Sequence, residues 1–278
     1  LAESMGRPYA ATASGGDWAF VKEQNLTGLV RCWIAFSYAA GQRLMAPHRQ
    51  WCYTAEKGTH WYDGPTPRFA PLYRFVRTHA SWFDGYTTQA DVGVVVPYRS
   101  FVKHPQRWFD MCNALATANV GYRLLVAGDE TVDHPLHEAE LLACRALIAT
   151  ETDDLLPADR QLLSRSLPGQ RRFLSAAEAI ESVAPAVKVE ATGPVRVLSR
   201  LGKAAVVIHL LNYDYDPSLD DVRPIENVSL TVDPAALGLG KVGRATLLTP
   251  ESGEAPLESR DGRVTVPRLG LWGLVRLE

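Results

Sequence analysis

The sequence predicts a mixed fold class, α/β over roughly its first two thirds and all-β over the rest, and three observations support this. Short apolar segments of strand length alternate with segments of helical periodicity up to about residue 183. Residues 91–97 form a nearly continuous apolar run, which is typical of a strand buried on both faces of a parallel sheet. Beyond residue 187, short strand-like segments follow one another between Gly, Pro and Asp turns.

The first predicted segment, residues 1–89, contains the order strand, loop, helix twice. The first repeat is a strand at 8–12, a Gly-rich loop at 13–17 and a helix that ends at Gly41. The second is a strand at 43–47, a long loop at 48–67 dense in polar and aromatic residues, and a helix at 69–83. This order predicts the C-terminal end of a (β/α)₈ barrel, whose active site lies on the loops that follow the strands.

Two further segments complete the predicted organisation. In residues 90–186, strands alternate with helices, which predicts a small parallel α/β domain; the strands are expected at 91–97, 122–127, 146–150 and 172–174. In residues 187–278, the pattern predicts a β-sandwich, with strands at 195–198, 204–211, 228–232, 244–248, 264–266 and 271–277. Leu1 to Pro8 resembles the last turns of a helix, so we expect the chain to be a fragment that starts within a domain.

Composition limits the partners of the chain. Its 278 residues are 46% hydrophobic and 22% charged, which is ordinary for a folded protein with two or three cores. The net charge of −2 comes from 29 basic and 31 acidic residues without long runs, so neither nucleic acid nor a membrane surface is an expected partner. No apolar run approaches about 18 residues and no signal-peptide pattern is present, which favours a cytoplasmic location. A neutral or small polar ligand fits this composition better.

Neither a metal nor a cofactor is expected. The four cysteines, Cys32, Cys52, Cys112 and Cys144, are far apart and lack zinc-binding spacing, so we expect free, mostly buried thiols. Residues 128–130 follow a strand where doubly wound sheets bind ligands, but no Gly-rich phosphate-binding motif follows the first strand. Residues 212–216 carry two acids in what we interpret as a strand-to-loop turn, not a calcium site. His209 lies in an apolar strand and is expected to be a core histidine.

The sequence resembles the trimeric β-galactosidases of glycoside hydrolase family 42. The resemblance rests on the Gly-rich segment 14–18, the helical segment 29–41, and the loop 48–51 together with Glu56 and His60. It implies a barrel followed by a flavodoxin-like domain and a β-sandwich, activity on β-galactosides or related glycosides, and a homo-oligomer. In that family the strand before the Trp-bearing loop ends in the glutamate nucleophile, whereas residues 9–14 here contain no carboxylate. The acid/base glutamate of the family would lie on an earlier strand, outside this chain.

The candidate catalytic residue is Asp17, which follows the first strand beside Trp18; its alternative is a structural Asp in a Gly-rich turn. Trp18, Trp51 and Trp61 are candidates for stacking on the apolar face of a sugar ring, because an indole offers a flat apolar surface. Their alternative is packing between domains.

Candidate polar contacts to the sugar lie in the long loop. The resemblance implies that Glu56 and His60 hydrogen-bond the hydroxyls of the nonreducing sugar, although their spacing is one residue longer than in the family. Arg49 and His48 are candidates for orienting a carboxylate. For all four residues the alternative is a solvated loop surface.

Two functions remain open from the sequence. One is the C-terminal part of a glycoside hydrolase, in which either the rest of a longer protein or a second chain supplies the rest of the barrel. The other is a non-catalytic carbohydrate-binding or assembly protein. A glutamine amidotransferase-like enzyme does not fit, since Cys112 is predicted within a helix and Cys144 before a strand. Two barrel strands alone would leave unpaired edges, so residues 1–89 need the rest of the barrel, packing on the other domains, or packing in an oligomer.

Overall fold

The computed structural model describes the chain except for residues 1–2, 8, 47–65, 166–169 and 261. It divides into two compact units, which are considered separately below. Unit 1 comprises Thr88–Lys188, Val232–Gly240 and the described residues among 1–8; unit 2 comprises Tyr9–Thr87, Val189–Thr231 and Lys241–Glu278.

Helices are concentrated before residue 183, as the sequence predicts. The helices, including two 3₁₀ turns η1 and η2, are α1 Gly15–Gln24, α2 Thr27–Ala39, α3 Thr66–Thr78, η1 Ala80–Trp82, α4 Tyr98–Lys103, α5 Pro105–Thr117, α6 Glu138–Leu142, η2 Thr152–Asp154, α7 Pro157–Ser164 and α8 Ala176–Ser182.

Strands occur along the whole chain and become dense after residue 187. They are β1 Ala10–Ala11, β2 Arg43–Leu44, β3 Thr87–Thr88, β4 Val92–Pro97, β5 Tyr122–Ala127, β6 Ala146–Ala149, β7 Arg171–Phe173, β8 Val187–Glu190, β9 Val195–Leu201, β10 Val206–Asn212, β11 Tyr215–Asp216, β12 Asp221–Val222, β13 Ile225–Val232, β14 Ala245–Thr249, β15 Gly253–Leu257, β16 Ser259–Arg260, β17 Arg263–Leu269 and β18 Trp272–Leu277.

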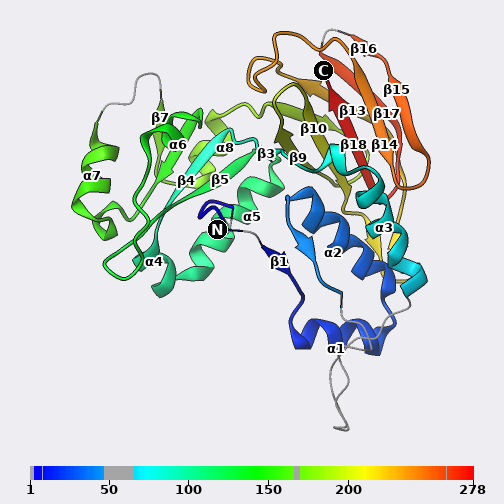
Figure 1. Cartoon of the computed structure of the whole chain (residues 1–278), viewed down its shortest axis with the longest axis horizontal. Coiled ribbons are helices and arrows are strands. Elements are labelled where there is room, and N and C mark those ends of the chain that lie inside the picture. Colours follow the sequence, from blue (N-terminus) through cyan, green and yellow to red (C-terminus); the bar gives the residue numbers. More distant parts are fainter. Residues whose placement is uncertain (1–2, 8, 47–65, 166–169, 261) are drawn as a thin grey trace. The chain divides into compact units, whose positions relative to one another are not determined.

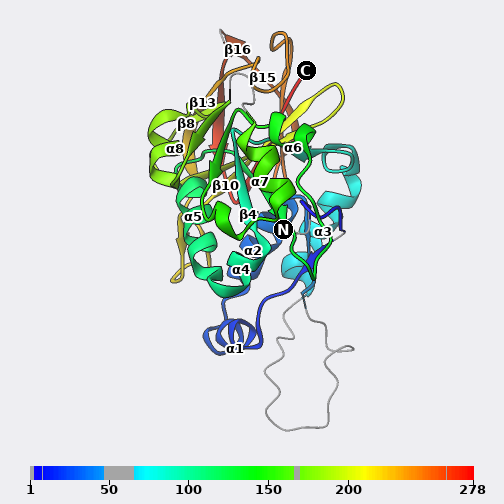
Figure 2. The same ribbon diagram turned by 90° about the vertical axis from the view of Figure 1, so that its left-hand side faces the viewer.

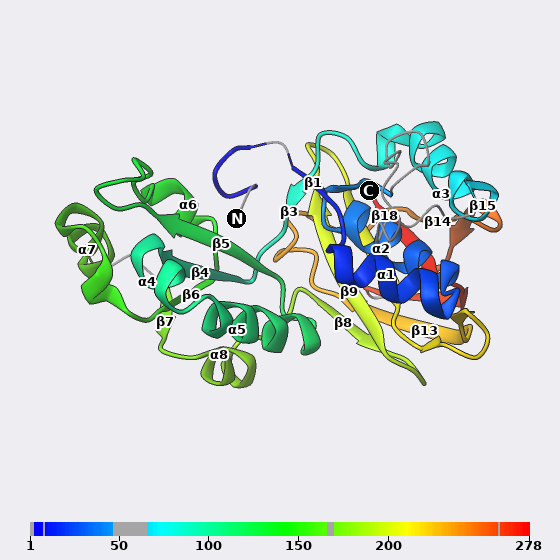
Figure 3. The same cartoon turned by 90° about the horizontal axis from the view of Figure 1, so that it is seen from below.

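Unit 1 is built on a four-stranded parallel sheet with the order β5-β4-β6-β7. Every residue of β4 is buried, which explains its continuous apolar sequence. α5 and α8 pack on one face and α6 and α7 on the other (Figures 2 and 3). The two faces of the sheet therefore carry separate cores, one around Trp108 and Leu115 and the other around Leu125 and Leu141.

Asp91 ties together several backbone segments of unit 1. Its side chain is 1% exposed and accepts hydrogen bonds from the backbone amides of Gly121 (3.1 Å) and Ala186 (3.2 Å). The side chains of Gln89 (3.1 Å) and Arg145 (2.9 Å) donate to it as well. One carboxylate thus joins the start of β4, the turn before β5 and the segment before β8.

Unit 2 contains the antiparallel strands that the sequence predicts. One sheet has the order β15-β14-β18-β10-β9-β3 and another has the order β16-β17-β13-β8 (Figure 1). β10 is buried along its whole length and pairs with β9 on one side and β18 on the other. The fold is thus mixed α/β, with parallel sheets as well as sandwich-like antiparallel sheets.

Residues 9–87 share a core with these antiparallel strands. Trp18, Ile34 and Phe75 belong to the same buried cluster as Val207 and Trp272. The two-stranded parallel sheet β1-β2 and the helices after it are therefore supported by packing on the sandwich. The sequence left open what stabilises this segment. In the structure, it packs on strands of the same chain. The division into segments at 89 and 186 stays a prediction.

Side chains of opposite charge hold the two ends of α2. At the N-terminal end, the Asp220 carboxylate accepts a hydrogen bond from the Gly28 amide at 2.7 Å. At the C-terminal end, the buried Arg200 guanidinium donates to the Ala40 carbonyl at 3.3 Å. Both charges complement the helix dipole. The approach requires glycine, because a Cβ on Gly28 would lie 1.8 Å from the Asp220 carbonyl oxygen.

His209 is a buried histidine, as expected from its apolar strand. Its ring is 1% exposed, stacks on Trp272 and accepts a hydrogen bond at Nδ1 from the indole Nε1 at 3.3 Å. Burial, aided by the positive charge of Arg200, lowers the pKa of His209 to about 3. The imidazole is therefore neutral in the folded chain across the physiological range.

This burial makes stability depend on pH. Below the ordinary histidine pKa of about 6.5, the unfolded chain takes up a proton at His209 and the folded chain does not, so acidification favours unfolding. Between pH 6.5 and 4 we expect this residue to lower the free energy of unfolding by about 1.4 kcal/mol per pH unit. Urea titrations of the wild type and of His209→Gln at several pH values measure this. Parallel pH profiles for the two proteins would contradict the assignment.

Helix α1 was not predicted. The glycines and small polar residues predict a loop at 13–17, whereas the helix begins at Gly15. A capping box explains the difference, because hydrogen bonds between Ser14 and Asp17 outweigh the low helix propensity of the two glycines. The helix ends at Gln24 and is followed by the C-cap residue Asn25, which has a left-handed backbone with φ 55°.

Candidate functional site

The first candidate site is the edge of unit 2 at which β1 and β2 end. The strands are parallel, with Ala10 opposite Arg43 and Ala11 opposite Leu44, so the loops after them begin at the same edge. The Thr12 hydroxyl joins the two loops by donating to the Met45 carbonyl at 3.1 Å. Ala11 and Leu44 face the core, whereas Ala10, Thr12 and Arg43 are exposed on the opposite side. In a βα barrel, loops in this position form the active site.

Asp17 lies at this edge, where its carboxylate serves as a helix cap. Oδ2 accepts from the Ser14 amide at 3.0 Å and from the Ser14 hydroxyl at 2.7 Å, while Ser14 Oγ accepts from the Asp17 amide at 3.2 Å. The hydrogen bonds from Ser14 lower the pKa of Asp17 below its ordinary value. The cap geometry matches the structural alternative for Asp17, and its catalytic role stays a prediction.

The cap gives a prediction about stability. We expect Ser14→Ala to lower the free energy of unfolding by about 1 kcal/mol, because it leaves the Asp17 amide without its acceptor. Asp17→Asn, which keeps the shape but loses the charge, is expected to cost less. Chemical denaturation of both variants checks this, and a Ser14→Ala variant as stable as the wild type would show that the capping box contributes nothing.

Trp18 belongs to the core. Its side chain is 1% exposed, and its ring meets Trp33 edge-on at a centroid distance of 5.4 Å. Its indole Nε1 donates to the Thr12 hydroxyl at 3.3 Å. The predicted sugar stacking does not fit this burial, because no indole face is left for a ligand. The alternative of packing fits, and through Thr12 the indole supports the loop after β1.

The remaining predicted sugar contacts lie outside the described residues. These are His48, Arg49, Trp51, Glu56, His60 and Trp61, all within 47–65. Their roles stay predictions. Met45, directly after β2, accepts a hydrogen bond from Thr12, which lies between β1 and the helix that carries Asp17.

The carboxyl ends of the parallel strands in unit 1 are the second candidate site. Arg99 after β4 forms an ion pair with Glu130 after β5, and Arg107 on α5 forms one with Glu151 after β6. Asp129 accepts hydrogen bonds from the Thr131 amide (2.8 Å) and hydroxyl (2.7 Å), which closes the turn after β5. Each of these charged groups thus has a partner within unit 1.

The described cysteines do not form a nucleophilic site. Cys32, Cys112 and Cys144 are free, as predicted. Burial raises the pKa of Cys32 to about 12 and that of Cys144 to about 11, and it also raises the pKa of Cys112. A thiol with a raised pKa has little thiolate at neutral pH and is a weak nucleophile.

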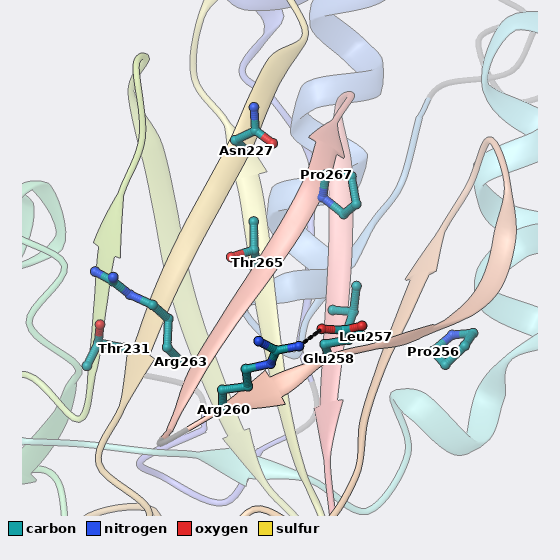
Figure 4. Close-up of a pocket in the computed structure, with 9 residues that line it drawn as sticks. All are labelled: Asn227, Thr231, Pro256, Leu257, Glu258, Arg260, Arg263, Thr265 and Pro267. Carbon is teal, nitrogen blue, oxygen red and sulfur yellow. Dashed lines mark hydrogen bonds and ion pairs between the residues drawn. The ribbon is translucent and has the colours of Figure 1, made fainter.

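A groove on the four-stranded sheet of unit 2 is the third candidate site (Figure 4). It has a volume of about 940 Å³, within the usual range for ligand sites. Residues of β13, β15, β16 and β17 and the short link between β15 and β16 line it. They are Asn227, Thr231, Pro256, Leu257, Glu258, Arg260, Arg263, Thr265 and Pro267.

The strand alternation of β17 builds the floor of this groove. Val264 and Val266 are fully buried in the sandwich, so Arg263, Thr265 and Pro267 face solvent. Pairing with β13 places Thr231 opposite Arg263. Sequence analysis missed this site, although it predicted a strand at 264–266. The signal was the alternation of apolar and polar residues in the sequence RVTVP, which marks a face with hydrogen-bonding side chains.

No three His, Cys, Asp or Glu side chains are placed to hold a metal ion among the residues that the structure describes. In the same part of the chain, no helix is both long and apolar enough to cross a membrane.

The fold is similar to that of parts of glycoside hydrolases of known structure. An α-L-fucosidase isoenzyme 2 from Paenibacillus thiaminolyticus matches 90% of this chain with a TM-score of 0.56 and 11% identity. A β-galactosidase from Bacillus circulans sp. alkalophilus matches 90% with a TM-score of 0.52 and 11% identity. The chain covers 57% and 52% of those chains. At such identities the likeness concerns the fold alone, and no family model matches the sequence.

Sequence similarity extends to agarases. The chain is 25% identical over 279 residues to an alpha-agarase from Alteromonas agarilytica and 26% identical over 281 residues to one from Thalassotalea agarivorans. Each alignment covers 94% of this chain and 19% of the relative, so the chain spans about a fifth of these curated relatives.

Proposed function

We propose that this chain is part of a glycoside hydrolase that acts on agar. The observation that carries the proposal is the alignment of 94% of the chain with two alpha-agarases. It covers both compact units, so it reflects more than one shared domain. The glycoside hydrolase-like fold supports the same reaction class independently of sequence identity.

The proposal includes a finer assignment of the architecture. The parallel pair β1-β2, each strand followed by helices, is taken as the end of a (β/α)₈ barrel. The order β5-β4-β6-β7 corresponds to 2-1-3-4 in chain order, which supports a flavodoxin-like domain. The sheets of unit 2 are taken as the β-sandwich.

The catalytic carboxylates are proposed to lie on barrel strands that this chain does not contain. Hydrolysis needs a pair of carboxyl groups, about 5 Å apart for retention and about 6.5–9.5 Å apart for inversion. At the described edge of β1 and β2, Asp17 is engaged in the cap. The proposed contribution of this chain is the loop after β2, with Arg49, Trp51, Glu56, His60 and Trp61 as sugar contacts.

The partner that supplies the other strands is either the rest of a longer polypeptide or a second chain. Homo-oligomer formation is a further part of the proposal, based on the resemblance to trimeric β-galactosidases.

A substrate panel tests the function. The protein that contains this chain together with a complete barrel should release reducing ends from agarose and leave aryl β-galactosides intact. Hydrolysis of the aryl β-galactoside without action on agarose would instead support the β-galactoside specificity that the sequence resemblance implies. Inactivity on every glycoside in the panel would defeat the hydrolase proposal.

A second candidate is a non-catalytic carbohydrate-binding or assembly protein. The observation in its favour is that Asp17, the catalytic candidate of the sequence analysis, caps a helix. Affinity for a polysaccharide without turnover, measured on the protein with its complete barrel, would distinguish this function from hydrolysis.

A further inference from the structure

The groove on the β13-β17 sheet has a lining whose charges are balanced. Arg260 forms an ion pair with Glu258 at 3.0 Å, drawn as a dashed line in Figure 4. Arg263 forms another with Glu190 of β8 at 2.9 Å. Each guanidinium therefore has a carboxylate beside it, which argues against a polyanion as the ligand and favours a neutral one.

The chemical groups in the groove match those of a sugar chain. Thr231, Thr265 and Asn227 offer hydroxyl and amide groups that both donate and accept hydrogen bonds. Pro267 and Leu257 add apolar surface beside them. A hexose presents hydroxyls at its rim and C–H groups on its face, so it can use both kinds of surface at once.

The ion pairs suit hydroxyl ligands in particular. The guanidinium of Arg260 has five N–H donors, and the carboxylate of Glu258 only accepts. Their side chains are 83% and 84% exposed, so both keep free hydrogen-bonding capacity toward a ligand. Together they can bind two neighbouring sugar hydroxyls. The Arg260 guanidinium donates a hydrogen bond to one hydroxyl, and the Glu258 carboxylate accepts one from the other.

We propose that this groove is a binding site for a neutral polysaccharide, of the agarose type, that holds the substrate chain outside the catalytic centre. The choice of agarose rests on the proposed function. The assignment of the groove as a sugar-binding site rests on its polar floor, its apolar border and its balanced charges. Because its residues lie on the solvent face of a sheet, a polymer can continue past the groove in both directions.

The test is binding by the 278-residue chain, which requires no catalysis. The chain should be retained on agarose beads, and isothermal titration with an agarose-derived hexasaccharide should show saturable binding. The double variant Arg260→Ala/Arg263→Ala is expected to bind the hexasaccharide at least about tenfold more weakly, because it loses two charged hydrogen-bonding groups. All four affected charges are exposed, so the thermal unfolding of this variant should match the wild type.

The matched control is Arg268→Ala. Arg268 lies on the same strand β17, is 66% exposed and pairs with Glu226 at 3.7 Å, but does not line the groove. The Arg268→Ala variant should bind the hexasaccharide as tightly as the wild type does. Equal binding by the double variant and the wild type, or no binding of the hexasaccharide by the wild type, would overturn the groove assignment.

Other outcomes would also decide against it. Binding of dextran sulfate alone, lost at high salt, would identify an anion surface. Self-association that the double variant abolishes, without sugar binding, would identify a contact between copies of the chain. Each result is separate from the fate of the proposed function, which depends on hydrolysis by the protein with a complete barrel.

Discussion

Trp272→Ala should lower the free energy of unfolding of unit 2 by about 3–5 kcal/mol, the usual cost of removing a fully buried tryptophan. The indole is 0% exposed and meets Phe75, Phe83 and His209 at centroid distances of 5.6, 5.5 and 5.8 Å. Phe75 and Phe83 come from the segment before residue 87, while Trp272 and His209 belong to the sandwich strands. The variant therefore weakens the packing of the β1-β2 region on the sandwich.

Denaturant unfolding of the chain, followed by circular dichroism, measures this effect. Phe20→Ala is the matched control, because Phe20 lies in the same unit and is 51% exposed. It should change stability by no more than about 0.5 kcal/mol. If the two variants were equally stable, Trp272 would not join the two parts of the core.

Asp91→Ala is expected to lower the free energy of unfolding of unit 1 by about 2–4 kcal/mol, because it leaves several buried hydrogen-bond donors without their acceptor. The variant leaves two backbone amides, Gly121 and Ala186, without their acceptor and Arg145 without its counter-charge. Unsatisfied buried amides carry a desolvation cost of their own.

Asp110→Ala provides the comparison for Asp91. Asp110 is an exposed carboxylate on α5 that accepts from Gln106 at 2.8 Å, and its loss should cost no more than about 0.5 kcal/mol. The loss of stability in Asp91→Asn should lie between those of Asp91→Ala and Asp110→Ala, since Asn retains an acceptor but not the charge. Similar unfolding midpoints for Asp91→Ala and Asp110→Ala would show that the hydrogen bonds of Asp91 do not stabilise unit 1.

Local patterns predicted much of the fold. The apolar run at 91–97 correctly indicated a buried parallel strand, and the helix predicted around Cys112 corresponds to α5. The sandwich strands followed from alternation and turn residues. α1 was missed because its propensity is poor and its stability comes from the Ser14 and Asp17 cap.

Long-range contacts could not be predicted from local patterns. Asp220 and Gly28 are separated by 192 positions, and nothing near either residue indicates that they meet. For the same reason the support of the β1-β2 pair by the sandwich appears only in the structure.

The candidate site was predicted unevenly. The position of Asp17 beside the end of β1 followed from the sequence, but its role as a cap depends on the geometry of Ser14. The burial of Trp18 depends on tertiary packing, which composition does not specify. The groove was not predicted, because exposed Thr, Asn and Arg side chains do not by themselves indicate a binding site. Strand pairing shows that they lie on one face of the sheet.

Reducing-end release from agarose is the measurement that decides the proposed role in agar hydrolysis. The assay uses the protein that combines this chain with a complete barrel. We expect a steady increase in reducing ends and the appearance of short agarose oligosaccharides. Intact agarose after prolonged incubation, with a folded protein that still binds the polymer, would contradict it.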